Sequence, residues 1–302
     1  MSSHTVPDFD TFFAGQPREH LLVAIDLALL EDGPDLTSDA VFGPVDRLAA
    51  QIVAKQQTLV AGLPIAPLVM ERCAALLESP VVGGWTWTPH TADGDELPPG
   101  SIAADIEGPA RLVLKAERVI LNFVCHLSGI ANLTRRYTRE LDGTSTRLLD
   151  TRKTLPGLRF PEKYAVLVGG GQNHRRTLAE MLMLKDNHID AAGSITAAVA
   201  ALRAAYAPCP PIEVECRTLD EVREAVACKV DRIMLDNMDL ALLRESLTVV
   251  PPGIETEASG GVTLETLRQL AEASPHGPDF VSVGRLTHSA PVADFSMRIR
   301  KA

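Results

Sequence analysis

Residues 146–189, TRLLDTRKTLPGLRFPEKYAVLVGGGQNHRRTLAEMLMLKDNHI, contain two short apolar runs on either side of a segment with helical spacing. The runs are TRLLDT (146–151) and MLMLKD (181–186), and PEKYAVLVG (161–169) lies between them. Further apolar runs follow at IEVEC (212–216), RIMLDN (232–237), IETEAS (254–259) and FVSVG (280–284). Helix-like segments separate them, at 194–206, 219–229, 240–247 and 263–273. Strict alternation of strand and helix predicts βαβ units and a parallel sheet.

Six such strands within about 140 residues are too few for a complete eight-stranded barrel, which takes about 250 residues. We therefore predict an incomplete parallel α/β barrel. A doubly wound open sheet is the main alternative, but no GxGxxG follows a first strand to support it.

The first 115 or so residues mix helices and strands without a regular repeat, which predicts an α+β domain. We expect helices over 17–31 and 64–77, and strands over 47–56, 82–90 and 101–107, with a turn at 94–100. A long helical stretch over 110–141 follows, and Ser128-Gly129 predicts a break within it.

Charge is distributed unevenly along the 302 residues. The chain carries a net charge of -10 and has a pI of about 5.3, yet residues 150–189 contain seven Lys or Arg and two His. Cations concentrated in one Gly-punctuated segment of an acidic protein indicate a site for a small anion. Nucleic acid or an anionic membrane would require a broadly basic face.

Cysteine usage and the absence of targeting segments indicate a cytoplasmic protein. The five cysteines form no CxxC pair, which argues against a disulfide framework and a zinc site. The N-terminal residues show no secretory signal, and no apolar run approaches the ~18 residues that a membrane span needs.

Polar residues gather where the predicted strands end, and in α/β barrels the carboxyl ends of the strands carry the active site. They are Asp150–Lys153, Lys185–His188, Glu213 and Glu215, Asp236-Asn237, Glu257 with Ser259–Gly261, and Gly284-Arg285. Each alone has a simpler explanation: a solvated cation, a salt bridge inside the barrel for Glu213 and Glu215, or an ordinary turn at Gly260-Gly261. Six successive strand ends of this kind favour a site, because buried charges are costly unless paired or used.

The residue types suggest which anions bind. Ser259–Gly261 and Gly284-Arg285 follow the last two strands, where barrels commonly bind phosphate. The carboxylates Glu215 and Asp236 suit Mg²⁺ or sugar hydroxyls, and arginines suit planar carboxylates. Gly169–Gly171 is not a Walker loop, because no GK[ST] follows; a flexible connection and a direct ligand contact both remain open.

The sequence resembles the quinolinate phosphoribosyltransferase family, also called nicotinate-nucleotide pyrophosphorylase (carboxylating). The matching motifs occur in family order over about half of the chain: DTRKTLPGLR, EKYAV, GGGQNHR, LKDNHI, EVEC, MLDN, EASGG and SVGRLTHS. EDGPDLTSD (31–39) and AERVILN (116–122) fit as well. Pro161 departs from the apolar, non-proline residue expected there.

The resemblance implies an N-terminal sandwich domain over 1–118 and an incomplete barrel over 119–288, with residues 289–302 packing back onto the first domain. It also implies a homodimer whose active sites are shared between the subunits. The reaction implied is Mg²⁺-dependent transfer of phosphoribosyl from phosphoribosyl pyrophosphate to quinolinate, with loss of CO₂, in NAD biosynthesis.

The resemblance also assigns roles to residues of this chain. The quinolinate carboxylates would be held by Arg152, His174, Arg175 and Lys185, with Arg118 reaching in from the partner subunit. Lys153 would meet the pyrophosphate, and Glu215 and Asp236 would serve the ribose hydroxyls or the metal. The 5′-phosphate would bind at Ser259, Gly260 and Gly284.

Two other functions stay open at this point. One is a related phosphoribosyltransferase for another acid, such as nicotinate. The other is a non-catalytic phosphosugar-binding module, which predicts the loss of Lys153, Glu215 or Asp236. All three residues are present.

Overall fold

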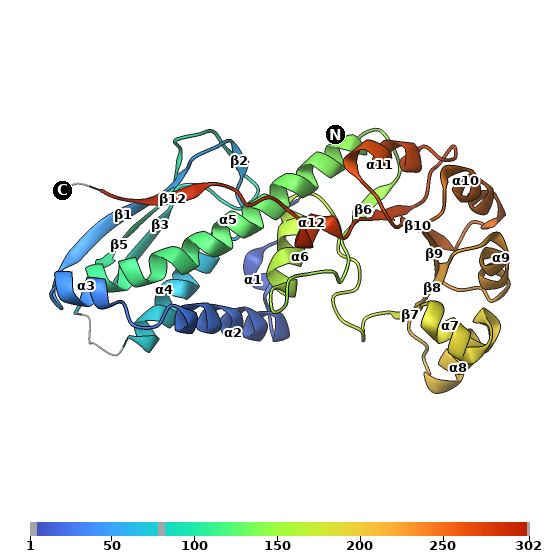
Figure 1. Cartoon of the computed structure of the whole chain (residues 1–302), viewed down its shortest axis with the longest axis horizontal. Helices are drawn as coiled ribbons and strands as arrows, with labels where there is room; N and C mark the ends of the chain where they lie inside the picture. Colours follow the sequence, from blue (N-terminus) through green and yellow to red (C-terminus); the bar gives the residue numbers. More distant parts are fainter. Residues whose placement is uncertain (1–4, 78–81, 301–302) are drawn as a thin grey trace. The chain divides into compact units, whose positions relative to one another are not determined.

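The computed structural model describes residues 5–77 and 82–300 of the chain (Figure 1). These residues fold into two compact units. The first comprises Met1–Thr134, Thr154–Gly170 and Leu286–Ala302, and the second comprises Arg135–Lys153 and Gly171–Arg285. The domain boundary expected after Arg118 falls inside a helix, and the first unit continues to Thr134. Within the described ranges, every helix is too short or too polar to cross a bilayer.

The first unit is built on an antiparallel sheet with the strand order β12-β1-β5-β3. Its strands are β1 (Arg47–Ala54), β3 (Thr86–Pro89), β5 (Ile102–Pro109) and β12 (Phe295–Ile299). The edge strand β12 comes from the far end of the chain and pairs with β1, so that Val53 lies opposite Ser296. Residues 301 and 302 of the segment expected to pack back lie outside the described residues.

Helices accompany this sheet, and β2 (Thr58–Leu59) pairs with β4 (Glu96–Leu97) in a two-stranded ribbon. Strand β4 lies inside the segment 94–100, which was predicted to be only a turn. The helices are α1 (Phe9–Phe12), α2 (Gln16–Glu31), α3 (Leu36–Val41), α4 (Ile65–Leu76), α6 (Arg159–Val168) and α12 (Arg285–His288). In α2, Leu21, Ile25 and Leu29 recur every four residues and are buried, as the helical spacing predicts. Pro161 lies in the first turn of α6, where a backbone N–H would have no intrahelical partner.

The second unit contains a six-stranded parallel sheet with the order β6-β11-β10-β9-β8-β7. The strands are β6 (Arg147–Leu149), β7 (Leu182–Leu184), β8 (Ile212–Cys216), β9 (Arg232–Asp236), β10 (Glu255–Ser259) and β11 (Phe280–Ser282). The helices α8 (Ile195–Ala205), α9 (Leu219–Ala227), α10 (Leu240–Val249) and α11 (Leu264–Ala271) alternate with the strands. A short helix that was not predicted, α7 (Asp186–Ala192), follows β7. This order and alternation confirm the incomplete parallel α/β barrel.

Helix α5 (Ala110–Glu140) is continuous, so the break predicted at Ser128-Gly129 is wrong. Neither residue interrupts the helix, because both serve tertiary contacts. The hydroxyl of Ser128 accepts a hydrogen bond from the Ala61 amide at 3.0 Å. A side chain at Gly129 would collide with the carbonyl oxygen of Pro291. The glycine therefore permits a close backbone approach rather than ending the helix.

Replacing Gly129 with alanine is expected to destabilise the protein by about 1–3 kcal/mol, because the added methyl group has no space beside Pro291. Helix propensity alone predicts the opposite sign, a gain of about 1 kcal/mol for Gly→Ala. Urea unfolding measures the difference. Gly84→Ala is the control, since a Cβ there meets no atom within 4 Å; a Gly129→Ala protein more stable than wild type would contradict the close approach.

Candidate active site

The carboxyl ends of the parallel strands meet at one edge of the sheet and bring predicted site residues together. The β9–β10 pairing places Ser259 opposite Asp236. Lys185 directly follows the neighbouring strand β7, and its ammonium lies 2.6 Å from a carboxylate oxygen of Glu215 on β8. Glu215 is largely buried, whereas Lys185 is exposed. The edge therefore combines carboxylates and a cation, as the strand-end pattern predicts.

Two arginines, Arg152 and Arg175, lie near each other in this unit. Burial lowers the pKa of Arg175, and the charge of Arg152 lowers it further. The Arg175 guanidinium donates to the carbonyl of Met181 at 3.0 Å. Nε of Arg152 is buried and finds no hydrogen-bond partner among the described residues. Two repelling guanidinium groups with an unused donor form a site that an anion would stabilise.

The loops after β9 and β10 are locked to each other. Asn237 adopts a left-handed conformation with φ 53°, its amide nitrogen donates to Asp236 at 2.7 Å, and its backbone N–H donates to Ser259 at 2.9 Å. Gly260 has φ +95°, and a side chain there would collide with the Asn237 side chain. Only glycine satisfies both the dihedral angle and the contact. Gly284 lies between β11 and α12.

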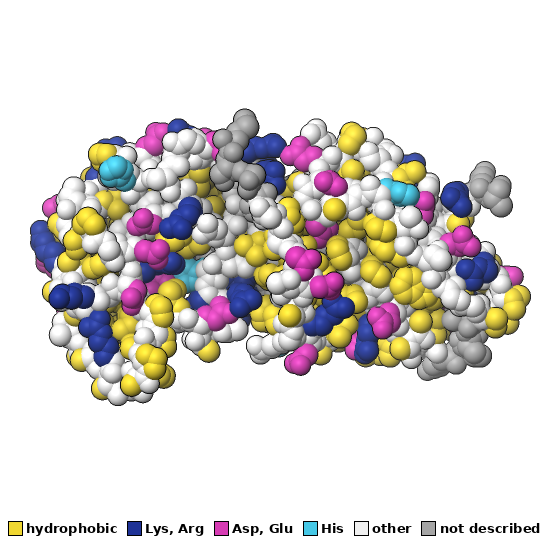
Figure 2. Space-filling model, turned by 180° about the vertical axis from the view of Figure 1, so that it is seen from behind, with side chains coloured by type: hydrophobic (Ala, Val, Ile, Leu, Met, Phe, Trp, Pro, Cys, Tyr) yellow, Lys and Arg dark blue, Asp and Glu magenta, His cyan; other side chains and the backbone are white. Residues whose placement is uncertain are grey.

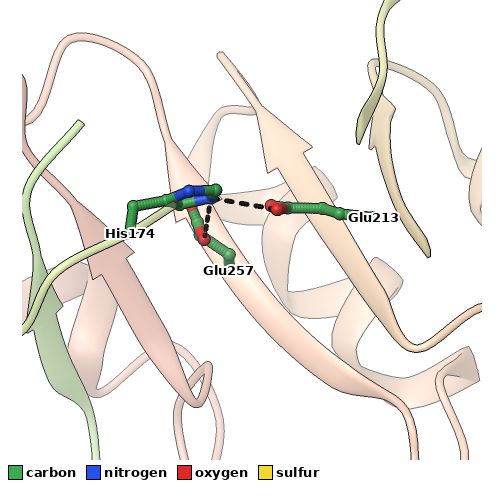
Figure 3. Close-up of side chains that lie close together, drawn as sticks. All are labelled: His174, Glu213 and Glu257. Atoms are coloured by element: carbon green, nitrogen blue, oxygen red, sulfur yellow. Dashed lines mark ion pairs between the residues drawn. The ribbon is translucent and has the colours of Figure 1, made fainter. Parts of the chain in front are cut away.

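A buried cluster lies inside the barrel, where His174 approaches two glutamates (Figure 3). Nε2 of His174 is 2.9 Å from Glu213 and 3.5 Å from Glu257. Glu213 and Glu257 come from β8 and β10 and are fully buried. Arg232 on β9 is 3.5 Å from Glu257, at the level of Glu213 in the sheet.

Burial lowers the pKa of His174, but the hydrogen bonds and charges of the two glutamates outweigh burial and raise it to about 9. Burial raises the pKa of Glu213, the nearby charge of Glu257 adds to this, and the hydrogen bond from His174 opposes it. Nδ1 of His174 accepts the backbone N–H of Arg175 at 2.7 Å, so in the neutral ring the proton is on Nε2.

The ligand atoms of these three residues lie within 4.8 Å of one another, which is close enough to share a metal ion. A proton on Nε2 suits the ion-pair contacts of 2.9 Å and 3.5 Å to the glutamates, whereas a metal ligand needs a free lone pair. We therefore interpret the cluster as an ion-paired group rather than a metal site.

The structure places the remaining predicted residues as follows. Lys153 is exposed after β6, and its backbone N–H donates to the Thr151 hydroxyl at 3.0 Å. Arg118 is exposed on α5 and belongs to the first unit, whereas the other predicted site residues belong to the second. On the face shown in Figure 2, Lys and Arg are interspersed with Asp and Glu, unlike a continuous basic surface for nucleic acid.

Comparison with known proteins identifies the family. The model of the quinolinate phosphoribosyl transferase N-terminal domain matches residues 35–128, and that of its C-terminal domain matches residues 130–298. The chain belongs to the quinolinate phosphoribosyltransferase family.

Relatives and solved structures agree with this assignment. A probable nicotinate-nucleotide pyrophosphorylase (carboxylating) of Bacillus subtilis is 43% identical over 265 residues, covering 88% of each chain. The crystal structure of NadC from Streptococcus pyogenes is 38% identical, with a TM-score of 0.83, covering 94% of this chain and 98% of that one. Nicotinate-nucleotide pyrophosphorylase from Ehrlichia chaffeensis is 32% identical with a TM-score of 0.84, covering 93% and 98%.

Sequence reasoning missed some contacts that the structure shows around the candidate site. It did not single out Arg232 or the link between Asn237 and Gly260. The period-2 alternation places Arg232 on the same face of β9 as Asp236, and this signal could have identified it. The Asn237–Gly260 contact depends on loop geometry that the spacing of residues does not reveal.

Proposed function

We propose that this chain transfers phosphoribosyl from phosphoribosyl pyrophosphate to quinolinate with loss of CO₂, giving nicotinate mononucleotide and pyrophosphate in a Mg²⁺-dependent reaction. The observation that carries the proposal is the pair Arg152 and Arg175, whose charges repel each other across a site with an unused buried donor. A dicarboxylate supplies the two negative charges that this pair lacks.

At the acceptor end, Arg152, Arg175 and Lys185 bind the carboxylates of quinolinate in this proposal, together with Arg118 of the partner subunit. The Lys185–Glu215 ion pair holds the lysine at the strand edge. Binding the dianion offsets the electrostatic repulsion between the two arginines. Part of the substrate affinity therefore comes from removing a repulsion that destabilises the ligand-free protein. His174 contacts protein groups through both ring nitrogens.

At the donor end, Glu215 and Asp236 face the ribose hydroxyls or Mg²⁺, because carboxylate oxygens are the ligands that this ion prefers. Mg²⁺ would supply charge neutralisation for the pyrophosphate. Lys153 lies after the first barrel strand and is exposed, and its ammonium would meet the leaving group. The locked loop at Ser259 and Gly260, with Gly284 beyond the next strand, would receive the 5′-phosphate.

The chemistry then follows from charge. The quinolinate ring nitrogen forms a bond to the anomeric carbon as the bond to pyrophosphate breaks, and the electron pair leaves with pyrophosphate. Glu215 and Asp236 stabilise the positive charge that develops on the sugar, and Lys153 stabilises the leaving group. The alkylated pyridinium ring accepts the electrons released by the adjacent carboxylate as CO₂ departs, and a proton from solvent replaces it on the ring carbon. The residues position and neutralise the substrates.

A mixed-dimer experiment tests the proposal that two subunits share each site. Arg118→Ala and Lys153→Ala proteins are each expected to be nearly inactive. Equal amounts, unfolded and refolded together, should regain about a quarter of the wild-type activity, because half of the dimers are mixed and each mixed dimer has one intact site.

The control is each variant taken alone through the same cycle. Sites built within one chain would leave the mixture as inactive as its components. Light scattering of the wild-type protein checks that the active species is a dimer.

A further inference from the structure

We propose that His174 is a positioning residue, which Glu213 and Glu257 anchor in the barrel and which in turn fixes Arg175 in the acceptor site without itself touching the substrate. This inference rests on the proposed function of the site.

Both ring nitrogens of His174 face the protein. Nε2 is 2.9 Å from Glu213, and Nδ1 accepts the backbone N–H of Arg175 at 2.7 Å. The residue is only 6% exposed. A carboxylate of the substrate would have to displace one of these contacts to reach a ring nitrogen, so the ring acts toward its own chain.

The segment around His174 is tied to the first barrel strand on its other side. The backbone of Gln172 forms a parallel bridge to Leu149, the last residue of β6. The buried carboxylate of Asp150 accepts hydrogen bonds from the Asn173 side chain at 2.7 Å and from the His174 backbone at 2.8 Å. The segment is therefore held by β6 through Asp150, and by β8 and β10 through the imidazole.

The two attachments of this segment fix the position of Arg175. Its backbone N–H is fixed by the His174 ring, and its guanidinium donates to Met181 at 3.0 Å and approaches the sulfur of Met183 at 3.6 Å. The side chain is thereby held near Arg152 despite the repulsion between them. An arginine fixed at both ends loses little further freedom when a carboxylate binds.

The two buried glutamates have a use in this arrangement. Both carboxylate oxygens of Glu213 and Oε1 of Glu257 lack a hydrogen-bond partner among the described residues, apart from the ion-pair contacts to the ring. Fully buried carboxylates are costly unless they serve another group. The negative charge of Glu213 acts on Arg175 and opposes the repulsion from Arg152. The imidazole stands between these carboxylates and its own backbone segment, which carries Arg175 (Figure 3).

A double-mutant cycle tests the proposal. His174→Ala is expected to raise the quinolinate KM by about 10²-fold through misplacement of Arg175, with the KM for phosphoribosyl pyrophosphate little changed. The same substitution in an Arg175→Ala background should add almost nothing. Glu213→Gln, which preserves the shape of the side chain, should also raise the quinolinate KM. If His174 instead bound the substrate directly, Glu213→Gln would leave the quinolinate KM unchanged. Independent, multiplying effects of His174→Ala and Arg175→Ala would overturn the proposal.

A second measurement works without turnover. Ring ¹⁵N signals of His174, recorded above its pKa of about 9 and assigned by comparison with His174→Gln, should show a protonated Nε2 and an unprotonated Nδ1, and saturating quinolinate should leave them nearly unchanged. A ring protonated on Nδ1, or one whose signals shift strongly with quinolinate, would contradict the anchoring role. If the wild-type protein formed no product from quinolinate, the proposed function would be refuted. The anchoring role of His174 would still be tested separately by its tautomer.

Discussion

Replacing Arg152 with glutamine is expected to raise the quinolinate KM by two to three orders of magnitude while leaving the free protein as stable as wild type or more stable. The loss follows from the removal of a half-buried cation that faces a substrate carboxylate in the proposed site, and losing such a partner typically costs about 2–5 kcal/mol of binding. The unchanged or raised stability follows because Arg152 and Arg175 repel each other in the free protein. Sites held ready for charged ligands commonly carry such a cost.

Steady-state kinetics with quinolinate, together with thermal unfolding of the ligand-free protein, measures both halves of this prediction. Arg223→Gln is the matched control: Arg223 is exposed on α9 and paired with Asp220 at 2.9 Å, so neither quantity should change much. If Arg152→Gln lost stability and activity together, Arg152 would be a structural residue, and the acceptor site would have to lie elsewhere.

Gly260→Ala is expected to reduce kcat/KM for phosphoribosyl pyrophosphate by about 10²-fold, since a small displacement of positioning groups suffices for such a loss. The new methyl group would meet the Asn237 side chain, which contacts Asp236 at 2.7 Å, and would favour a different φ from +95°. The loop after β10 and the carboxylate at the end of β9 would then move together. Both belong to the proposed donor end of the site.

Gly261→Ala provides the control for the Gly260 substitution, because Gly261 also has a positive φ, +60°, but a Cβ there meets no atom within 4 Å. Backbone strain alone costs about 1–2 kcal/mol in either variant. Comparable kcat/KM losses in the two variants would show that backbone strain, and not the contact with Asn237, causes the loss of activity.

The barrel strands were predictable because each is a short apolar run that ends in polar residues, and this local pattern survives in the folded chain. A break was wrongly predicted in helix α5, because a glycine such as Gly129 locally disfavours a helix. The glycine is needed there because the backbone of Pro291, far away in the sequence, packs closely against it. Tertiary contacts overrode propensity there. The two-stranded ribbon at β2 and β4 and the short helix α7 carry too little periodicity to be recognised.

The candidate site shows the same division. The strand-end position of Glu215 and Asp236 follows from alternation along β8 and β9. The position of His174 does not, because its partners Glu213 and Glu257 come from two strands that lie far along the chain from it. The motif alone indicated a substrate ligand, and only the geometry of the ring shows the contacts that support a positioning role.

The most direct test of the central claim is to incubate the purified protein with phosphoribosyl pyrophosphate, Mg²⁺ and either quinolinate or nicotinate, and to measure mononucleotide and CO₂. The structure-based proposal predicts nicotinate mononucleotide and an equal amount of CO₂ from quinolinate, and no product from nicotinate. Product from nicotinate without CO₂ would contradict the proposed acceptor, and no product from either acid would contradict phosphoribosyl transfer itself.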